Sequence, residues 1–166
     1  MWLEDVMPSN LRHAEESLRV ELGVALGAAL ISSTGKPLVT FATTVEEAVR
    51  EADLAIDCVP DELESKLEIF SLLDRMAPPR TVFATPTMSL SIADLASCTY
   101  RPGQCIGMAI HASQLSDPSE NSGARQISIR VTSRTTIEAQ SLVCAFWEKL
   151  GYAPLVELDA AEPMLR

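Results

Sequence analysis

The stretch DLAIDCVPDELESKLEIFSLLDRMAPPRTVFATP, residues 53 to 86, contains the alternation of apolar patterns that decides the fold. Residues 53 to 59 form a nearly continuous apolar run, which predicts a strand buried on both faces. After Pro60 and Asp61, apolar side chains recur at helical spacing; they are Leu63, Leu67, Phe70, Leu73 and Met76. Pro78 and Pro79 end this helix, and residues 81 to 86 read as the next strand.

The same alternation extends toward both ends of the chain. On the N-terminal side the pattern predicts strands at 1–6 and 37–42, a helix at 9–31 with Ser9 as its N-cap, and a helix at 43–52. Thr43 or Thr44 caps that second helix, with Glu46 or Glu47 in the reciprocal capping position.

On the C-terminal side the pattern predicts helices at 89–98 and 135–151 and strands at 104–110, 125–132 and 153–159. The inward residues of the last helix are expected to be Ile137, Val143, Phe146 and Leu150, and Gly151 stands at its C-terminal end.

Strands separated by helices predict an α/β fold, with a mostly parallel sheet, right-handed crossovers and helices on its faces. A chain of 166 residues with 47% hydrophobic content is the size of a single domain, here 1–166. Ligands of such sheets bind outside the carboxyl ends of the strands. Asp5 and the turns at 58–61, 85–89 and 109–113 are therefore expected along one edge.

Composition argues against several classes of partner. The formal net charge is −10 and no Lys/Arg run is longer than a pair, so nucleic acid is not expected as a partner. No apolar run is long enough to span a bilayer and the first residues do not resemble a signal peptide, so we expect a cytoplasmic protein without a membrane partner. The four cysteines have no metal-ligand spacing, which indicates reduced thiols and no metal site.

From about Thr44 to Met108 the chain resembles, without a gap, the NAD-binding domain of the 3-hydroxyacyl-CoA dehydrogenases. This resemblance implies a Rossmann-type domain, NAD as the cofactor, an acyl-CoA or nucleotide ligand, and hydride transfer at the 3-hydroxyl carbon. It also implies that Asp5 binds the adenine ribose, since a carboxylate accepts hydrogen bonds from both hydroxyls. Asp61 and Lys66 stand where the family has an acidic residue and a lysine near the nicotinamide.

Several positions depart from the family pattern. Only four residues precede Asp5, so the first strand and the glycine-rich turn that binds pyrophosphate are missing from the sequence, and the family's C-terminal helical domain is missing as well. Met88 replaces the serine that holds the substrate oxygen, and Ala109 replaces the catalytic histidine. Ser128 stands near the position of the family's glutamate. Neither Met88 nor Ala109 can perform the proton chemistry of the residue that it replaces.

Three functions remain open. The first is a degenerate dehydrogenase domain that binds NAD or acyl-CoA weakly, with weak or no hydride transfer. The second is a structural or assembly protein that forms a homodimer, or recruits a partner chain, through exposed sheet edges. The third is an active dehydrogenase in which His111, two residues beyond Ala109, serves as the base with Asp117 or Glu120.

The missing first strand leaves three alternatives. The strands at 1–6 and 53–59 pair directly, another chain supplies a strand between them, or Met1 is not the true start.

Overall fold

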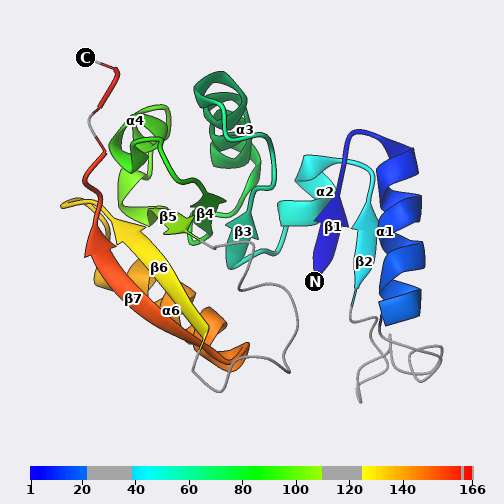
Figure 1. Cartoon of the computed structure of the whole chain (residues 1–166). Helices are drawn as coiled ribbons and strands as arrows, with labels where there is room; N and C mark the ends of the chain where they lie inside the picture. Colours follow the sequence, from blue (N-terminus) through cyan, green and yellow to red (C-terminus); the bar gives the residue numbers. More distant parts are fainter. Residues whose placement is uncertain (22–38, 110–124, 162, 166) are drawn as a thin grey trace. The chain divides into compact units, whose positions relative to one another are not determined.

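The computed structural model describes residues 1–21, 39–109, 125–161 and 163–165 (Figure 1). These residues fall in two compact units, Met1–Ala52 and Asp53–Arg166. Each unit is described by itself.

The first unit contains a two-stranded parallel sheet and two helices. Strand β1 (Trp2–Glu4) pairs in parallel with β2 (Thr40–Ala42). Helix α1 spans Pro8–Glu21 and α2 spans Val45–Val49. The capping prediction for α2 is confirmed for one of its alternatives. The Thr44 hydroxyl accepts a hydrogen bond from the backbone N–H of Glu47, and the Glu47 carboxylate accepts one from the N–H of Thr43.

The prediction that Ser9 caps the first helix is wrong. Proline fixes φ near the helical value and has no N–H to satisfy, so it favours the first helical position, and Pro8 begins α1 there. Ser9 therefore lies inside the helix. Asp5 is the residue that satisfies the backbone just before α1, because its Oδ1 accepts a hydrogen bond from the N–H of Met7 at 2.7 Å.

The second unit contains a five-stranded sheet in the order β3-β4-β5-β6-β7. The strands are β3 (Leu54–Ile56), β4 (Val82–Pro86), β5 (Cys105–Ala109), β6 (Arg125–Val131) and β7 (Tyr152–Leu158). The helices are α3 (Leu63–Met76), α4 (Ile92–Ser97), α6 (Ile137–Lys149) and a short 3₁₀ helix, Pro102–Gln104. Only the β5–β6 pair is antiparallel, so the predicted mostly parallel sheet is confirmed.

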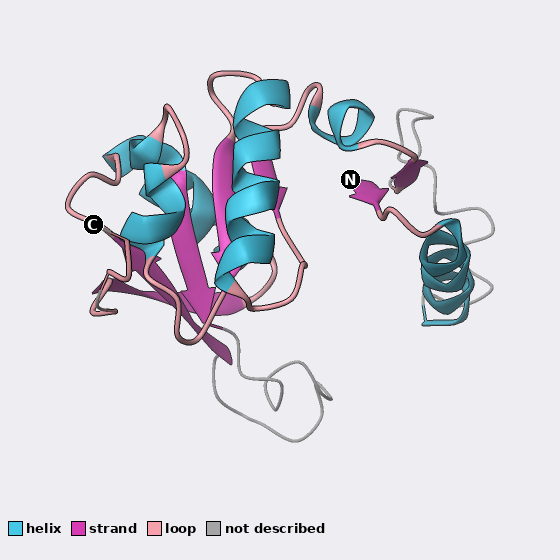
Figure 2. Ribbon diagram, turned by 90° about the horizontal axis from the view of Figure 1, so that it is seen from above, coloured by secondary structure: helices cyan, strands magenta, loops and turns pink. Residues whose placement is uncertain are grey.

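Helices cover both faces of this sheet (Figures 1 and 2). Right-handed crossovers place α3 and α4 on one face and, because the strand direction reverses at β6, place α6 on the other. Consecutive residues of β5 show the two faces directly. A Cβ at Gly107 would meet Ile92 of α4, whereas Met108 accepts a hydrogen bond on its sulfur from the Trp147 indole of α6. Ala109, like Gly107, belongs to the α4 face.

The second unit buries apolar side chains on both faces of its sheet, with Phe70, Phe83, Ile92 and Leu95 on the α3 and α4 side and a larger cluster on the α6 side. The buried members of the cluster on the α6 side are Val82, Ala84, Ile106, Met108, Ile127, Ile129, Ala139, Val143 and Trp147. Three residues predicted to face inward are instead exposed, namely Ile137 (78%), Leu150 (56%) and Met76 (38%). Each stands in the first or last turn of its helix, or just beyond it, where the chain enters or leaves the packed layer.

The prediction that the strand at 53–59 is buried on both faces is also wrong. Only Ala55 of β3 is buried, and Ile56 is 37% exposed. Strand β3 is short and stands at one end of the five-strand order, where it pairs with β4. Among the described residues, no helix has the length and apolar content needed to cross a membrane.

Candidate functional site

A turn at the carboxyl end of β4 carries two of the positions singled out from the sequence. The N–H of Thr87 donates to the carbonyl of Met108 at 3.0 Å, which joins the turn to β5. The Thr87 hydroxyl in turn accepts from the N–H of Leu90 at 3.0 Å. Ser91 then caps α4 by accepting from the N–H of Asp94. These bonds fix the backbone on both sides of Met88 and Ser89.

Arg130 of β6 holds the same turn from the other side. Its guanidinium donates to the carbonyl oxygens of Thr87 at 3.1 Å and Leu90 at 3.0 Å, and it forms an ion pair with Asp159. The second oxygen of Asp159 accepts from the N–H of Ile92, the first residue of α4, at 2.7 Å. Sequence reasoning missed both Arg130 and Asp159. The one available signal was an arginine within the alternating apolar strand QISIRV.

A cavity of about 350 Å³ lies beside this turn. Its lining residues are Met88, Ser89, Ala109, Arg130, Glu157, Leu158, Ala160 and Ala161. The cavity therefore brings together Met88 and Ala109, the two positions at which the sequence departs from the proton-handling residues of the family it resembles. A volume of this size fits part of a small-molecule ligand.

A carboxylate of β7, that of Glu157, also lines this cavity. Ala109 and Ser128 are directly opposite each other in the antiparallel β5–β6 pair. The Ser128 hydroxyl donates a hydrogen bond to Oε1 of Glu157, on β7, at 2.7 Å. Sequence reasoning pointed to Ser128 and missed Glu157, because the contact depends on the register between β6 and β7.

Lys66 lies inside the protein and is paired with a carboxylate. Its ammonium is 2.8 Å from Oδ1 of Asp57, and the exposed fractions of the two side chains are 0% and 1%. Asp57 follows β3 directly and its N–H donates to the carbonyl of Ala84 on β4. The Asp57 Oδ2 and the Thr85 hydroxyl, at the ends of these adjacent strands, are buried without a hydrogen bond from the described residues.

Asp61 and Asp5 are both accessible to a ligand. Asp61 is exposed and its Oδ2 accepts a hydrogen bond from the N–H of Met88 at 3.2 Å, so it contacts the turn after β4. Asp5 follows β1. Hydrogen bonds from the Asn10 amide and from the N–H of Met7 hold the pKa of its carboxyl below the ordinary value. Each Asp5 oxygen keeps a further lone pair that can accept a hydrogen bond.

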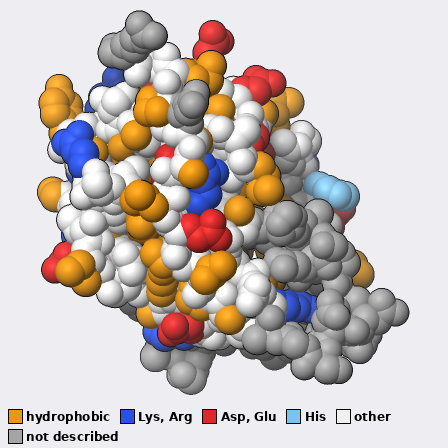
Figure 3. Space-filling view, turned by 60° about the vertical axis from the view of Figure 1, so that its left-hand side comes forward, with side chains coloured by type: hydrophobic (Ala, Val, Ile, Leu, Met, Phe, Trp, Pro, Cys, Tyr) orange, Lys and Arg blue, Asp and Glu red, His pale blue; other side chains and the backbone are white. Residues whose placement is uncertain are grey.

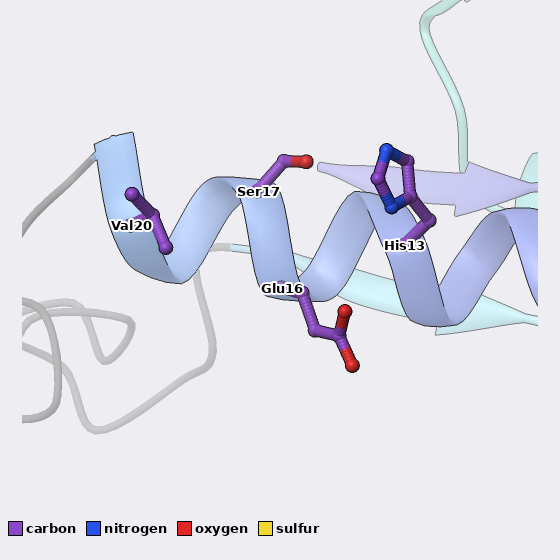
Figure 4. A pocket seen from close by; sticks show the side chains of 4 residues that line it. All are labelled: His13, Glu16, Ser17 and Val20. Atoms are coloured by element: carbon purple, nitrogen blue, oxygen red, sulfur yellow. The ribbon is translucent and has the colours of Figure 1, made fainter.

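His111, the proposed alternative base, and its partners Asp117 and Glu120 lie outside the described residues. A second hollow, of about 310 Å³, is lined by His13, Glu16, Ser17 and Val20 of α1 (Figure 4). His13 and Ser17 project to one side of the helix and Glu16 to the other. Because one helix supplies all four side chains, they do not converge on a ligand.

A mostly parallel sheet with helices on both faces, and with polar side chains at the carboxyl ends of its strands, defines a Rossmann-like dinucleotide-binding fold. The sequence model described as "3-hydroxyacyl-CoA dehydrogenase, NAD binding domain" matches residues 2–113. The chain therefore belongs to the 3-hydroxyacyl-CoA dehydrogenase NAD-binding domain family, whose cofactor is NAD.

Curated relatives agree with this assignment. The probable 3-hydroxybutyryl-CoA dehydrogenase of Bacillus subtilis is 40% identical over 70 residues, which are 42% of this chain and 24% of that protein. The mitochondrial hydroxyacyl-coenzyme A dehydrogenase of Homo sapiens is 32% identical over 110 residues, covering 63% of this chain and 35% of that protein. The chain thus spans a quarter to a third of the length of these two relatives.

Solved structures confirm the fold. The 3-hydroxybutyryl-CoA dehydrogenase of Escherichia coli superposes with a TM-score of 0.77 at 20% identity, over 95% of this chain and 33% of that one. The (S)-3-hydroxybutyryl-CoA dehydrogenase of Ralstonia eutropha gives a TM-score of 0.76 at 18% identity, over 96% of this chain and 55% of that one.

Proposed function

We propose that the chain is a degenerate 3-hydroxyacyl-CoA dehydrogenase domain that binds NAD or an acyl-CoA and transfers hydride weakly or not at all. The observation that carries this proposal is the cavity lined by both Met88 and Ala109. Family members have a hydroxyl and an imidazole at these two positions, by the resemblance described above. A thioether donates no hydrogen bond and a methyl group exchanges no proton, so neither of these two positions can supply the hydrogen-bond donor or the base that family members have there.

Cofactor binding is supported by the accessible carboxylates. Asp5 follows a strand of the first unit, and an ionised aspartate at this place is an acceptor for ribose hydroxyls. In the second unit, Asp61 contacts the turn that carries Met88. Lys66 is held by Asp57, so a role for its ammonium at a ligand would require that buried pair to open.

A thermal-shift titration with NAD, NADH and acetoacetyl-CoA tests the binding. A ligand of the native state raises stability by RT ln(1 + [L]/Kd), so a saturable shift is expected. Asp5→Ala should reduce the shift with NAD and NADH. Glu64→Ala, which removes an exposed carboxylate of α3, is the matched control and should leave it unchanged. The absence of any shift at millimolar ligand would contradict the binding proposal.

A turnover assay tests the proposal that the domain transfers hydride weakly or not at all. We expect little or no oxidation of 3-hydroxybutyryl-CoA with NAD by the natural sequence, and a gain of turnover when Met88→Ser and Ala109→His are combined. Rapid turnover by the unaltered chain would contradict the proposal. If the unaltered chain turned over rapidly and His111→Ala abolished this turnover, His111 would be the base instead.

Exposed apolar residues on β7 favour a second candidate function, assembly with a second copy or a partner chain. Strand β7 is last in the strand order, and Leu155, Val156 and Leu158 are 53%, 39% and 70% exposed. Figure 3 brings forward the side of Figure 1 on which β7 and α4 lie, and hydrophobic side chains are interspersed there with polar ones. Light scattering of the wild type and of Leu158→Lys tests it. A concentration-dependent dimer weakened by the substitution supports assembly, and a monomer at every concentration contradicts it.

A further inference from the structure

Among the described residues that line the cavity beside Met88, Glu157 is the one carboxylate, and it is exposed. Glu157 stands on β7 directly beside Arg130 of β6, in parallel register, and its Oε1 accepts the Ser128 hydroxyl at 2.7 Å. This bond orients the carboxylate without using all of its acceptor sites, because a carboxylate has two oxygens and about four lone-pair positions. A ligand in the cavity would therefore meet an oriented acceptor.

The polar groups around Glu157 differ in what they offer a ligand. The Arg130 guanidinium is already bonded to the carbonyls of Thr87 and Leu90 and to Asp159. Met88 and Ala109 contribute only apolar surface, and the Ser89 hydroxyl both donates and accepts. Asp159 balances the charge of Arg130, and among the described lining residues the Glu157 carboxylate is the charged group without an ion-pair partner. When ionised, this carboxylate accepts hydrogen bonds and does not donate them.

We propose that Glu157 of β7 provides a carboxylate beside Ser128, which stands near the position of the family's glutamate. This carboxylate makes the cavity bind a 3-hydroxyacyl thioester in preference to the corresponding 3-ketoacyl thioester. A hydroxyl can donate to the carboxylate, whereas the negative end of a ketone carbonyl is repelled by it. Ser128 acts as the positioning residue, because its hydroxyl orients Glu157. This inference rests on the proposed acyl-CoA ligand.

Calorimetric titration with (S)-3-hydroxybutyryl-CoA, acetoacetyl-CoA and butyryl-CoA tests the selectivity. One charge-assisted hydrogen bond predicts that the wild type binds the hydroxyl ligand about tenfold more tightly than the ketone. Glu157→Gln keeps the size of the side chain and adds an N–H donor, so this preference should fall to about one or reverse. Glu148→Gln, on the exposed surface of α6, is the matched control and should keep the wild-type ratio.

The variant Ser128→Ala distinguishes loss of the hydrogen bond that orients Glu157 from general damage to the fold. It should lower the hydroxyl-to-ketone ratio and leave the affinity for butyryl-CoA, which has neither group, unchanged. Equal binding of (S)-3-hydroxybutyryl-CoA and acetoacetyl-CoA by the wild type, or an unchanged affinity ratio in Glu157→Gln, overturns the role of Glu157. If butyryl-CoA still binds in that case, the proposed function stands. If butyryl-CoA also fails to bind, the acyl-CoA assignment and this inference both fall.

Discussion

Lys66 is a charged residue in a fully buried environment. Its side chain is fully buried, and its only ion-pair partner among the described residues is Asp57, whose side chain is 1% exposed. Moving two charges out of water is costly, and their attraction offsets this only when the geometry is good. The pair joins α3 to the end of β3, so it determines how that helix sits on the sheet edge where the candidate site lies.

Breaking this pair on one side should be strongly destabilising. Lys66→Met leaves Asp57 as an uncompensated buried charge, and we expect a loss of about 3 to 5 kcal/mol in the free energy of unfolding, measured in urea. Adding Asp57→Asn should recover much of that loss. The exposed pair Arg80–Asp53 is the matched control, with side chains 63% and 69% exposed, and Arg80→Met should cost less than about 1 kcal/mol. Equal costs for the two single variants would contradict this account.

Cys105 should make the stability depend on alkaline pH. Burial raises the pKa of its thiol from an ordinary value near 9 to about 12, so the folded state keeps a proton that the unfolded chain releases. The resulting contribution to stability is complete below about pH 9 and is lost as pH rises toward 12. The free energy of unfolding should therefore fall between about pH 9 and pH 12, and less steeply in Cys105→Ala. Parallel pH profiles for the two proteins would count against the raised pKa.

At the scale of elements, Gly107 permits the close approach of α4 to the sheet. A Cβ at this position would lie 2.5 Å from Cδ1 and 2.8 Å from Cγ1 of Ile92, and 3.2 Å from Cβ of Arg130. Ile92 is fully buried and begins α4, so it cannot turn into solvent. The lack of a side chain at Gly107 thus allows α4 to pack close to β5, and this packing positions the turn that lines the cavity.

Gly107→Ala should therefore destabilise the second unit by about 1 to 3 kcal/mol through overpacking, measured by thermal or urea unfolding. Ile92→Val removes the Cδ1 atom and should relieve part of this cost in the double variant, although it is mildly destabilising by itself. Additive costs in the double variant, or no cost for Gly107→Ala alone, would show that α4 adjusts freely.

Elements were predictable where a local pattern decides them. The apolar spacing and the flanking prolines located α3, and Thr44 with Glu47 located the start of α2. The sequence did not reveal that Lys66 is buried, because a lysine on a helix reads as solvent-exposed until its partner, nine residues earlier, is placed beside it. Glu157 was missed for the same reason, since its contact with Ser128 depends on strand register and not on spacing along the chain.

At the scale of the whole molecule, the two compact units differ in how much they bury. The second unit buries a cluster of nine residues between its sheet and α6, and further apolar side chains such as Phe70, Phe83 and Leu95 on the other face. The described residues of the first unit include only two buried hydrophobic side chains, Ala42 and Val49, and its sheet has two strands of three residues each. Sheets of two strands are marginally stable by themselves, so the first unit should lose its structure at a lower denaturant concentration.

Each unit has one tryptophan, which makes this difference measurable. Trp2 of β1 is 47% exposed, whereas Trp147 of α6 is 8% exposed. Urea unfolding followed by tryptophan fluorescence should show two transitions in the wild type. Trp2→Phe should remove the earlier one and keep the later one, because the remaining signal comes from Trp147. Far-ultraviolet circular dichroism of the variant is the control and should still show the earlier loss of structure. One coincident transition by both methods would mean that the two units unfold cooperatively, contrary to the prediction.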